Sequence, residues 1–347
     1  MLCNSLKLFS LLVVATGAAG RPVPPNESSP LGRDLDIAAG INALPRVHAK
    51  VPRTIRGENV PTGILGEFVE LSALAYDEDD ELVETMCGAT ALEGGWLLTA
   101  AHCVTDIVAI DFTLYGIDGT KEKLPPSVVE IFVPDTYDPE GRMEAYKNSR
   151  STAPPTNVFY GDIALIKVPE LETRAVTYPA LPTSKDDIET TPVLVAVGVG
   201  VTEAGVTAED LQFVSVTLEG RVGLTSDKVA REIAIETGLL LDHDHFVAID
   251  ASQNTCHGDS GGAVLIPHDR WEAATADEDL DEHASALTGQ RNVIVGVTSW
   301  GDQHCRGAWG AYTDVHHWMP WIEDTFTGLN EPIGVIPTID FILSFVQ

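Results

Sequence analysis

A serine, Ser260, stands in the glycine-rich run Cys256–Gly262, directly after an acidic residue. A serine hydroxyl is a weak nucleophile until a base takes its proton, and the base needs a third group that orients it. His102 and Asp162 lie upstream, in the order His, Asp, Ser that is known from one form of catalytic triad. Each residue alone could be structural, as a buried histidine, a capping acid or a turn serine. Together they predict Ser260 as nucleophile, His102 as base and Asp162 as the orienting acid.

The segments around these residues resemble those of the trypsin/chymotrypsin family of serine proteases: Leu97–Val104, Gly161–Ile166 and Gly258–Gly262. The resemblance implies an all-β fold, with two six-stranded antiparallel β-barrels, the active site between them and a short C-terminal helix. It also implies a serine endopeptidase that hydrolyses peptide bonds through an acyl-enzyme. The backbone N–H groups of Gly258 and Ser260 would form the oxyanion hole, where the loss of one donor lowers the rate by about 10²–10³.

From about residue 65 onward, short runs of Val, Leu and Ile are separated by Gly, Pro, Asp and Thr, a pattern that predicts strands and turns. The predicted strands are Glu67–Leu74, Trp96–Thr99, Ile163–Val168, Val193–Val197, Phe213–Leu218, Ala263–Ile266 and Val293–Ser299. Trp318, Trp321 and Ile322 would share one face of a helix, which predicts a short amphipathic helix over Trp318–Phe326.

Residues 1–20 have the pattern of a secretory signal peptide, with Lys7, an apolar core over Leu8–Ala15 and small residues at Ala18–Gly20. The apolar core is too short to span a bilayer, and a buried N-terminal helix is the alternative interpretation. The Pro-rich residues 21–53 are interpreted as a propeptide, which carries the glycosylation sequon Asn26–Ser28. We therefore expect a secreted, extracellular glycoprotein that is made as a zymogen.

Activation in this family cleaves after a basic residue and frees an apolar N-terminus, usually Ile-Val, which is followed by a variable residue and then by Gly. Alignment on Gly57 places Arg53 before the cut and Thr54 at the new N-terminus, with Ile55 as the alternative terminus. The resemblance implies that Asp259 pairs with the freed α-amino group and thereby shapes the oxyanion hole. A turn cap is the alternative role for Asp259.

We expect the protease domain to span residues 54–326, with one barrel over about 54–172 and the other over about 173–326. Residues 138–158 lengthen the connection between His102 and Asp162, and the acidic residues 267–291 form an insertion after the Ser260 strand. The tail, residues 327–347, is too short for a membrane anchor, and it could pack on the barrel or bind a partner.

The chain has five cysteines, of which Cys3 would be lost with the signal peptide. Secretion favours disulfides, and the four remaining cysteines allow three connectivities. The family resemblance implies the pairs Cys87–Cys103 and Cys256–Cys305. The first would hold the loop of His102, and the second would join the Ser260 segment to the Cys305 segment across the substrate pocket.

The resemblance also assigns residues that bind substrate. Ser299, Trp300 and Gly301 would pair with an extended substrate backbone, although Trp300 could instead pack in the core. Asn254 and Thr255 would form the floor of the specificity pocket, and Gly301 and Gly310 its walls. Asn254 stands where a trypsin has Asp, so the pocket favours a bulky uncharged residue before the scissile bond. The alternative is a trypsin-like preference for basic residues, in which Asp302 at the pocket rim supplies the negative charge.

The run Asp242–His245 alternates acids and histidines, and alternate residues on a strand share one face, where they could ligate a metal together with His316 and His317. We instead expect a solvated loop at 242–245. The loop Gly116–Lys123 is short for the calcium site of the family, and no metal or other cofactor is predicted.

The net charge of −31 at pH 7 excludes nucleic acid as a natural partner. The first 53 residues hold six of the 21 basic and three of the 52 acidic residues, so their removal would make the net charge −34. We expect a solvated acidic surface on a monomer that acts on protein or peptide substrates, can be bound by protein inhibitors and does not bind membranes.

Two other functions remain possible at this stage. One is an inactive or weakly active homologue that serves as a binding protein, although such homologues usually lose a triad residue and this chain keeps all three. The other is an acyl-hydrolase that acts mainly on esters, because the chemistry is shared. Cleavage of peptides by the activated protein separates these functions.

Overall fold

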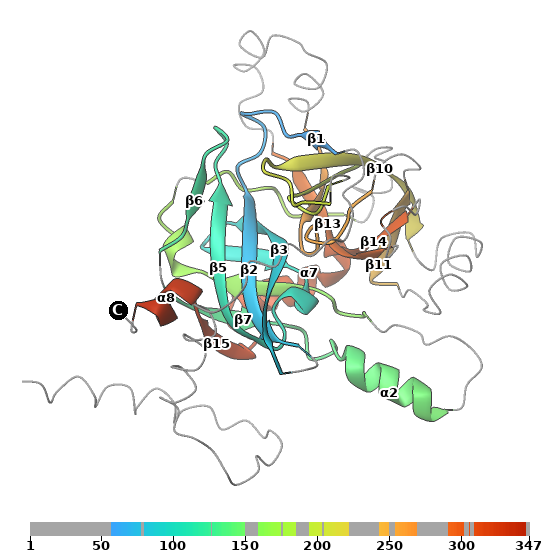
Figure 1. Ribbon diagram of the computed structural model, residues 1–347. Coiled ribbons are helices and arrows are strands. Elements are labelled where there is room, and N and C mark those ends of the chain that lie inside the picture. The colour runs from blue at the N-terminus through green and yellow to red at the C-terminus, as the bar shows by residue number, and fades with distance from the viewer. Residues whose placement is uncertain are drawn as a thin grey trace, which may run out of the picture.

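The computed structural model describes residues 57–77, 80–125, 127–149, 159–174, 176–184, 194–202, 205–221, 243–249, 254–268, 291–301, 305 and 309–344. The predicted signal peptide, the predicted propeptide with Arg53, Thr54, Asp302 and residues 269–290 of the acidic insertion lie outside them. The described residues form mostly strands, arranged in two sheets (Figure 1). None of the helices in these ranges is long and apolar enough to cross a membrane.

The first sheet holds eight antiparallel strands in the order β15-β7-β8-β4-β3-β2-β5-β6. In chain order they are β2 (Phe68–Tyr76), β3 (Leu82–Leu92), β4 (Trp96–Thr99), β5 (Ile107–Tyr115), β6 (Lys121–Lys123), β7 (Val128–Phe132), β8 (Ala164–Lys167) and β15 (Gly334–Pro337). The edge strand β15 also contacts β5, so the sheet curls around its own core.

The second sheet closes into a barrel. Its six strands pair in the order β10-β11-β14-β13-β12-β9, and β9 pairs again with β10. The short strand β1 adds to the outer edge of β10. The bounds are β1 (Glu58–Asn59), β9 (Leu194–Gly198), β10 (Gln212–Arg221), β11 (His245–Ile249), β12 (Ala263–Ile266), β13 (Val293–Gly301) and β14 (Trp309–Asp314).

Few helices accompany the two barrels in the described ranges. They are the short 3₁₀ turns η2 (Ala101–Cys103) and η3 (Pro169–Leu171) and the α-helices α2 (Pro139–Ser149), α7 (Val315–Phe326) and α8 (Ile339–Leu343). The α2 helix lies in the 138–158 extension and projects away from the barrels (Figure 1). The α7 helix begins after Asp314, whose carboxylate accepts hydrogen bonds from the N–H groups of His316 and His317.

The all-β fold with two barrels and a C-terminal helix is confirmed. Each strand predicted from the sequence occurs, with ends that differ by at most three residues, and the amphipathic helix begins three residues earlier than predicted. The first barrel differs in strand number, because β6 and β15 add to the six that were expected. The β15 strand comes from the tail, in which no strand was predicted because its apolar run is short.

The two barrels share one apolar core. Side chains alternate between the faces of a strand, and in β9 this alternation sends successive residues to different places. Leu194 and Ala196 point into the second barrel, where they pack with Phe246 and Tyr312. Val195 and Val197 join the larger cluster that includes Leu97 and the first barrel. The seam between the barrels is therefore a packed core, and residues on either side of it are held at fixed positions.

The tail packs on the first barrel. Strand β15 pairs with β7, and Ile339 and Ile342 of α8 pack on Leu74 and Ala109. The side chain of Asp111 in β5 accepts hydrogen bonds from the backbone N–H groups of Ile339 and Asp340. Of the two roles left open for the tail, the structure shows the packing on the barrel.

Candidate functional site

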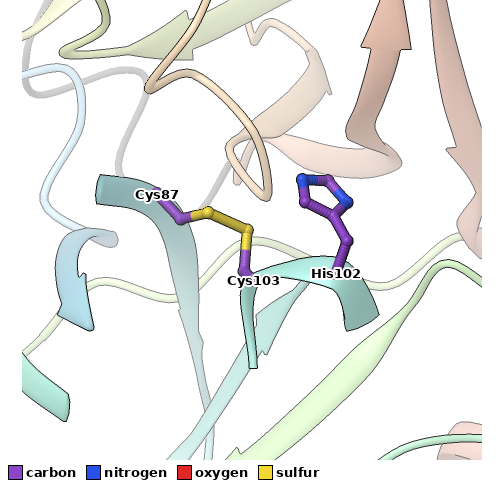
Figure 2. A group of neighbouring side chains, drawn as sticks. All are labelled: Cys87, His102 and Cys103. Carbon is purple, nitrogen blue, oxygen red and sulfur yellow. A yellow bond between two sulfur atoms is a disulfide. The ribbon is translucent and has the colours of Figure 1, made fainter. Parts of the chain in front are cut away.

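His102 lies at the seam, in the 3₁₀ turn that follows β4. The next residue, Cys103, forms the predicted disulfide with Cys87 of β3, and the two Cα atoms are 6.2 Å apart. Figure 2 shows the imidazole of His102 beside this disulfide. One potential ligand atom from each of Cys87, His102 and Cys103 lies within 4.8 Å of the other two, but the disulfide removes both thiolates that a metal would need. The disulfide therefore fixes the turn that carries His102.

Asp162 is fully buried just before β8 and faces His102. Its Oδ2 lies 2.8 Å from Nδ1 of His102, and its Oδ1 accepts the backbone N–H of His102 at 3.0 Å. The hydroxyl of Ser299, on β13 of the second barrel, donates to Oδ2 at 2.5 Å. Since Nδ1 of His102 donates to a carboxylate, Nε2 is the nitrogen left to act as a base.

The two groups shift each other's pKa in opposite directions. Burial raises the pKa of Asp162, but the positive charge of His102 and the hydrogen bonds from His102 and Ser299 outweigh burial and leave that pKa below the ordinary 3.8. Burial lowers the pKa of His102, but the charge and hydrogen bond of Asp162 leave it above the ordinary 6.5.

Ser260 is half-buried in the turn before β12. Its carbonyl oxygen accepts the N–H of Gly88 at 2.6 Å, so the Ser260 turn is tied to β3 next to Cys87. A Cβ atom at Gly261, whose φ is +77°, would collide with the Gly88 carbonyl and the Thr99 hydroxyl. Glycine at 261 therefore allows the two barrels to meet backbone to backbone, close to the turn of His102.

Within the described residues, the Ser260 hydroxyl has no hydrogen bond to His102, a bond that in many hydrolases tightens only when substrate binds. The N–H groups of Gly258 and Ser260 likewise have no acceptor in that part of the chain. Gly258 has a φ of +93°, and a Cβ there would lie 3.0 Å from Met86 Cε and 3.1 Å from Gly200 Cα. The turn thus presents two backbone donors, at a position that only glycine occupies without strain.

Asp259 is buried beneath this turn, with 2% of its surface exposed. Its Oδ1 accepts the N–H of Gly200 at 2.7 Å, and its Oδ2 accepts the N–H of Cys256 at 2.8 Å. Cys256 forms the second predicted disulfide, with Cys305, and the Cα atoms are 5.3 Å apart. The carboxylate and the disulfide together fix the conformation of the Ser260 turn.

The residues assigned to the substrate pocket also lie close together. Gly301 and Gly310 are paired across β13 and β14, and Asn254 is buried with its amide donating to the carbonyl of Trp309 at 3.1 Å. The hydroxyl of Thr255 lies 3.4 Å from that of Tyr312, a buried residue that the sequence interpretation missed. Burial and the charge of Asp259 outweigh the Thr255 hydrogen bond and raise the pKa of Tyr312 to about 12, so its phenol is neutral.

Trp300 packs against other aromatic rings. Its indole contacts Phe159 at a ring separation of 5.2 Å and Trp309 at 5.4 Å. The β13 strand has a register shift between Thr298 and Trp300, next to the Ser299 that binds Asp162. One short segment therefore carries both a contact to the buried acid and residues of the candidate pocket.

The expectation of a solvated loop at 242–245 is wrong for its second half. Asp244 is fully buried and His245 is 1% exposed, at the start of β11. The charged, alternating pattern resembled a surface loop, but pairing of β11 with β14 carries these two residues inside. Asp242 lies outside the described residues.

The family model described as Trypsin matches residues 71–322. Clotting factor C of Tachypleus tridentatus is 26% identical over 254 residues, which cover 68% of this chain but 22% of that protein. CLIP domain-containing serine protease B14 of Anopheles gambiae is 24% identical over 293 residues, 76% of this chain and 71% of that protein. The chain thus spans about a fifth of the length of the clotting factor.

A solved structure titled as HL collagenase is similar in fold, with a TM-score of 0.53 and 19% sequence identity. The similarity covers 79% of this chain and 98% of that one. It supports the two-barrel architecture.

The contact between His102 and Asp162 predicts how His102 titrates. In a Ser260→Ala background, which removes the predicted nucleophile, the Cε1–H resonance of His102 should titrate above pH 6.5. Asp162→Asn should lower that pKa, because it removes the carboxylate charge that stabilises the imidazolium. Asp324→Asn, on the exposed face of α7, is the matched control and should leave the titration unchanged. Equal titration in the Asp162 and Asp324 variants would contradict the assignment.

Proposed function

Because the chain belongs to the trypsin family, we propose that it is a secreted serine endopeptidase that cleaves peptide bonds through an acyl-enzyme on Ser260. The observation that carries the proposal is the buried carboxylate of Asp162, 2.8 Å from Nδ1 of His102. This contact leaves Nε2 of His102 as the basic nitrogen, and the Ser260 turn is tied to β3, the strand whose Cys87 is disulfide-bonded to the neighbour of His102.

In this mechanism the hydroxyl oxygen of Ser260 attacks the carbonyl carbon of the scissile peptide bond. Nε2 of His102 takes the hydroxyl proton and then delivers it to the leaving amine, and a water molecule afterwards releases the acyl group by the same route. Asp162 holds the imidazole in the Nδ1–H tautomer and stabilises the imidazolium that forms. The N–H groups of Gly258 and Ser260 donate to the oxyanion of each tetrahedral intermediate.

Substitution of the nucleophile tests the proposal. Ser260→Ala should lower kcat for peptide hydrolysis by at least about 10⁴-fold, because the acyl-enzyme cannot form. Ser344→Ala, at the exposed C-terminal end of α8, is the matched control and should retain wild-type turnover. Activity should be measured on unfolded protein and on an ester. Peptide hydrolysis by the Ser260 variant at the wild-type rate would refute the mechanism. Hydrolysis of the ester but not of the protein substrate by the unsubstituted chain would favour an acyl-hydrolase.

The proposal includes export and activation. Residues 1–20 act as signal peptide, residues 21–53 as propeptide, and cleavage after Arg53 frees the α-amino group of Thr54. That ammonium then pairs with the buried carboxylate of Asp259. In this proposal the ion pair adds to the two hydrogen bonds that Asp259 accepts from Gly200 and Cys256, and it stabilises the active conformation of the Ser260 turn and of the oxyanion hole.

The position of Gly57 supports this pairing. Gly57 lies beside β10, because a Cβ at Gly57 would be 3.2 Å from Gln212 Cβ. Gln212 in turn pairs with Gly198 of β9. Gly198 lies against Asp259, because a Cβ at Gly198 would collide with Oδ1 of that residue. Gly57 therefore lies about two strand spacings, or roughly 10 Å, from the carboxylate. The three residues Thr54–Arg56 span about 10 Å when extended, whereas a chain beginning at Ile55 spans about 7 Å. The geometry favours Thr54 as the terminus.

N-terminal sequencing of the active form should therefore return Thr54. Arg53→Gln should leave a precursor without activity although the triad is intact, because the α-amino group is not freed. Arg46→Gln removes a basic residue of the same segment and should be activated normally. A fully active species in which residue 53 is still joined to residue 54 would overturn this activation scheme.

We further propose that the pocket prefers a bulky uncharged side chain before the scissile bond. Its floor holds Asn254 and Thr255, its walls lack side chains at Gly301 and Gly310, and the phenol of Tyr312 behind it is neutral. A basic side chain would lose water without a buried counter-charge, a loss of several kcal/mol. A bulky neutral side chain would gain about 2–3 kcal/mol from burial of apolar surface.

Peptides that differ only at this residue should be cleaved with higher kcat/KM for Phe, Tyr, Leu or Met than for Lys or Arg. Asn254→Asp should raise the relative rate for Arg, because it adds a carboxylate at the floor. Asn148→Asp adds the same charge on the exposed face of α2 and should not alter the preference. A wild-type preference for Arg or Lys would show that another acid, such as Asp302, serves the pocket.

A further inference from the structure

A second buried acid–histidine pair lies behind Asp162. Nδ1 of His245 is 2.8 Å from Oδ1 of Asp244, and both side chains are within the second barrel with almost no exposed surface. Nε2 of His245 points to two hydroxyl groups, 3.3 Å from Oγ of Ser299 and 3.5 Å from Oγ1 of Thr313. Both hydroxyls also contact Asp162, so the pair is linked to the proposed catalytic acid through one layer of side chains.

The hydrogen-bond directions restrict the form of His245. Ser299 gives its hydroxyl hydrogen to Oδ2 of Asp162, and Thr313 gives its own to the backbone carbonyl of Asp162 at 2.8 Å. Nδ1 of His245 must donate to Asp244, because a carboxylate only accepts. A neutral His245 would then present a lone pair at Nε2 to two oxygens that have no hydrogen left. The imidazolium presents an N–H there, which the lone pairs of both hydroxyls can accept.

The surroundings stabilise a positive charge at this position. Asp244 supplies the counter-charge and is itself anchored, since its Oδ2 accepts the N–H of Gly161 at 2.8 Å. Burial raises the pKa of Asp244, but the charges of His245 and His317 and the hydrogen bonds outweigh it and leave that pKa below 3.8. The charged groups that face His245 are thus Asp244 on its own strand and Asp162 across Ser299, with His102 beyond Asp162 and His317 on α7 near Asp244.

We propose that His245 acts as a positioning residue: as an imidazolium held by Asp244, it donates from Nε2 to Ser299 and thereby keeps the Ser299 hydroxyl directed at Asp162. The inference rests on the proposed serine protease function. The chain of contacts runs from Asp244 through His245 and Ser299 to Asp162 and ends at His102. Because Asp244 also binds the N–H of Gly161, the same pair holds the backbone just before Asp162.

The positive charge of His245 also has an electrostatic effect on the site. It reaches the Asp162 carboxylate through a single hydroxyl, that of Ser299, so in this proposal it reduces the negative charge that His102 senses and restrains the rise in the pKa of His102. Removal of the pair should therefore raise that pKa further. A residue that merely fills space in the barrel would not produce this shift.

Paired substitutions test the positioning role of His245 without leaving an unpaired buried charge. Asp244→Asn with His245→Leu removes the ion pair and the donor, whereas Asp244→Asn with His245→Gln removes the charge but keeps an amide that can donate to Ser299. The first should move the acid limb of the kcat/KM profile up by about half a pH unit and lower kcat about tenfold with little change in KM. The second should recover part of the kcat. His316→Leu, on α7, is the histidine control and should match wild type.

A double-mutant cycle identifies the route. If His245 acts through Ser299, the Leu pair should cause little further loss of kcat in a Ser299→Ala background, because coupled residues are non-additive. Equal losses with and without Ser299 would overturn the proposal, as would a pH profile that does not move.

Titration of His102 by NMR in the inactive Ser260→Ala protein needs no turnover. In that background the Leu pair should raise the pKa of His102, and the ¹⁵N shifts of His245 in the unsubstituted pair should show N–H at both ring nitrogens. A neutral His245 ring would refute the inference whether or not the protein is a protease. If the wild-type protein has no peptidase activity, the proposed function is refuted, and the NMR result alone then decides this inference.

Discussion

The carboxylate of Asp162 is fully buried at the seam of the two barrels, and an unpaired charge at such a depth would destabilise the fold by several kcal/mol. Its hydrogen bonds come from both sides of the seam. His102 donates from its backbone and its ring on the first barrel, and Ser299 donates from the second. The barrels cannot separate or slide without leaving these groups unpaired, so one acid couples the packing of the whole molecule to the orientation of the His102 ring.

The position of Ser260 depends on a different constraint, the close approach of two backbones. Gly88 of β3 and the Gly261–Gly262 turn meet so closely that a Cβ at Gly88 would lie 2.9 Å from the Cα of Gly262. The bond from the Gly88 N–H to the Ser260 carbonyl forms at this contact. Larger residues would push the Ser260 turn away from the His102 turn, so these glycines bring the proposed nucleophile and the proposed base to the same seam although they belong to different barrels.

The sequence could predict the parts of the site that depend on local chemistry. The strands followed from their apolar runs, and both disulfides that the family resemblance implied are present, although the cysteines alone allowed three connectivities. It could not predict which polar residues would be buried, because that depends on strand pairing across long separations. Asp244 and His245 look like a surface loop by composition, yet the register of β11 against β14 places them inside. The same limit hid the contact between Ser299 and Asp162, which are 137 residues apart.

The shifted pKa values of the seam have opposite consequences for stability and for catalysis. Asp162 has a lowered pKa, so it stabilises the fold above pH 3.8, and this contribution is lost as the pH falls through its folded value. His102 has a raised pKa, so its charged form stabilises the fold below pH 6.5, and this contribution is lost as the pH rises through its folded value. The pair is therefore most stabilising between these limits, where His102 is protonated and cannot serve as the base that we propose for Ser260. At the higher pH that the base requires, the neutral ring is held by its Nδ1–H bond to Asp162, and the buried anion depends more on Ser299 and on the groups that direct the Ser299 hydroxyl.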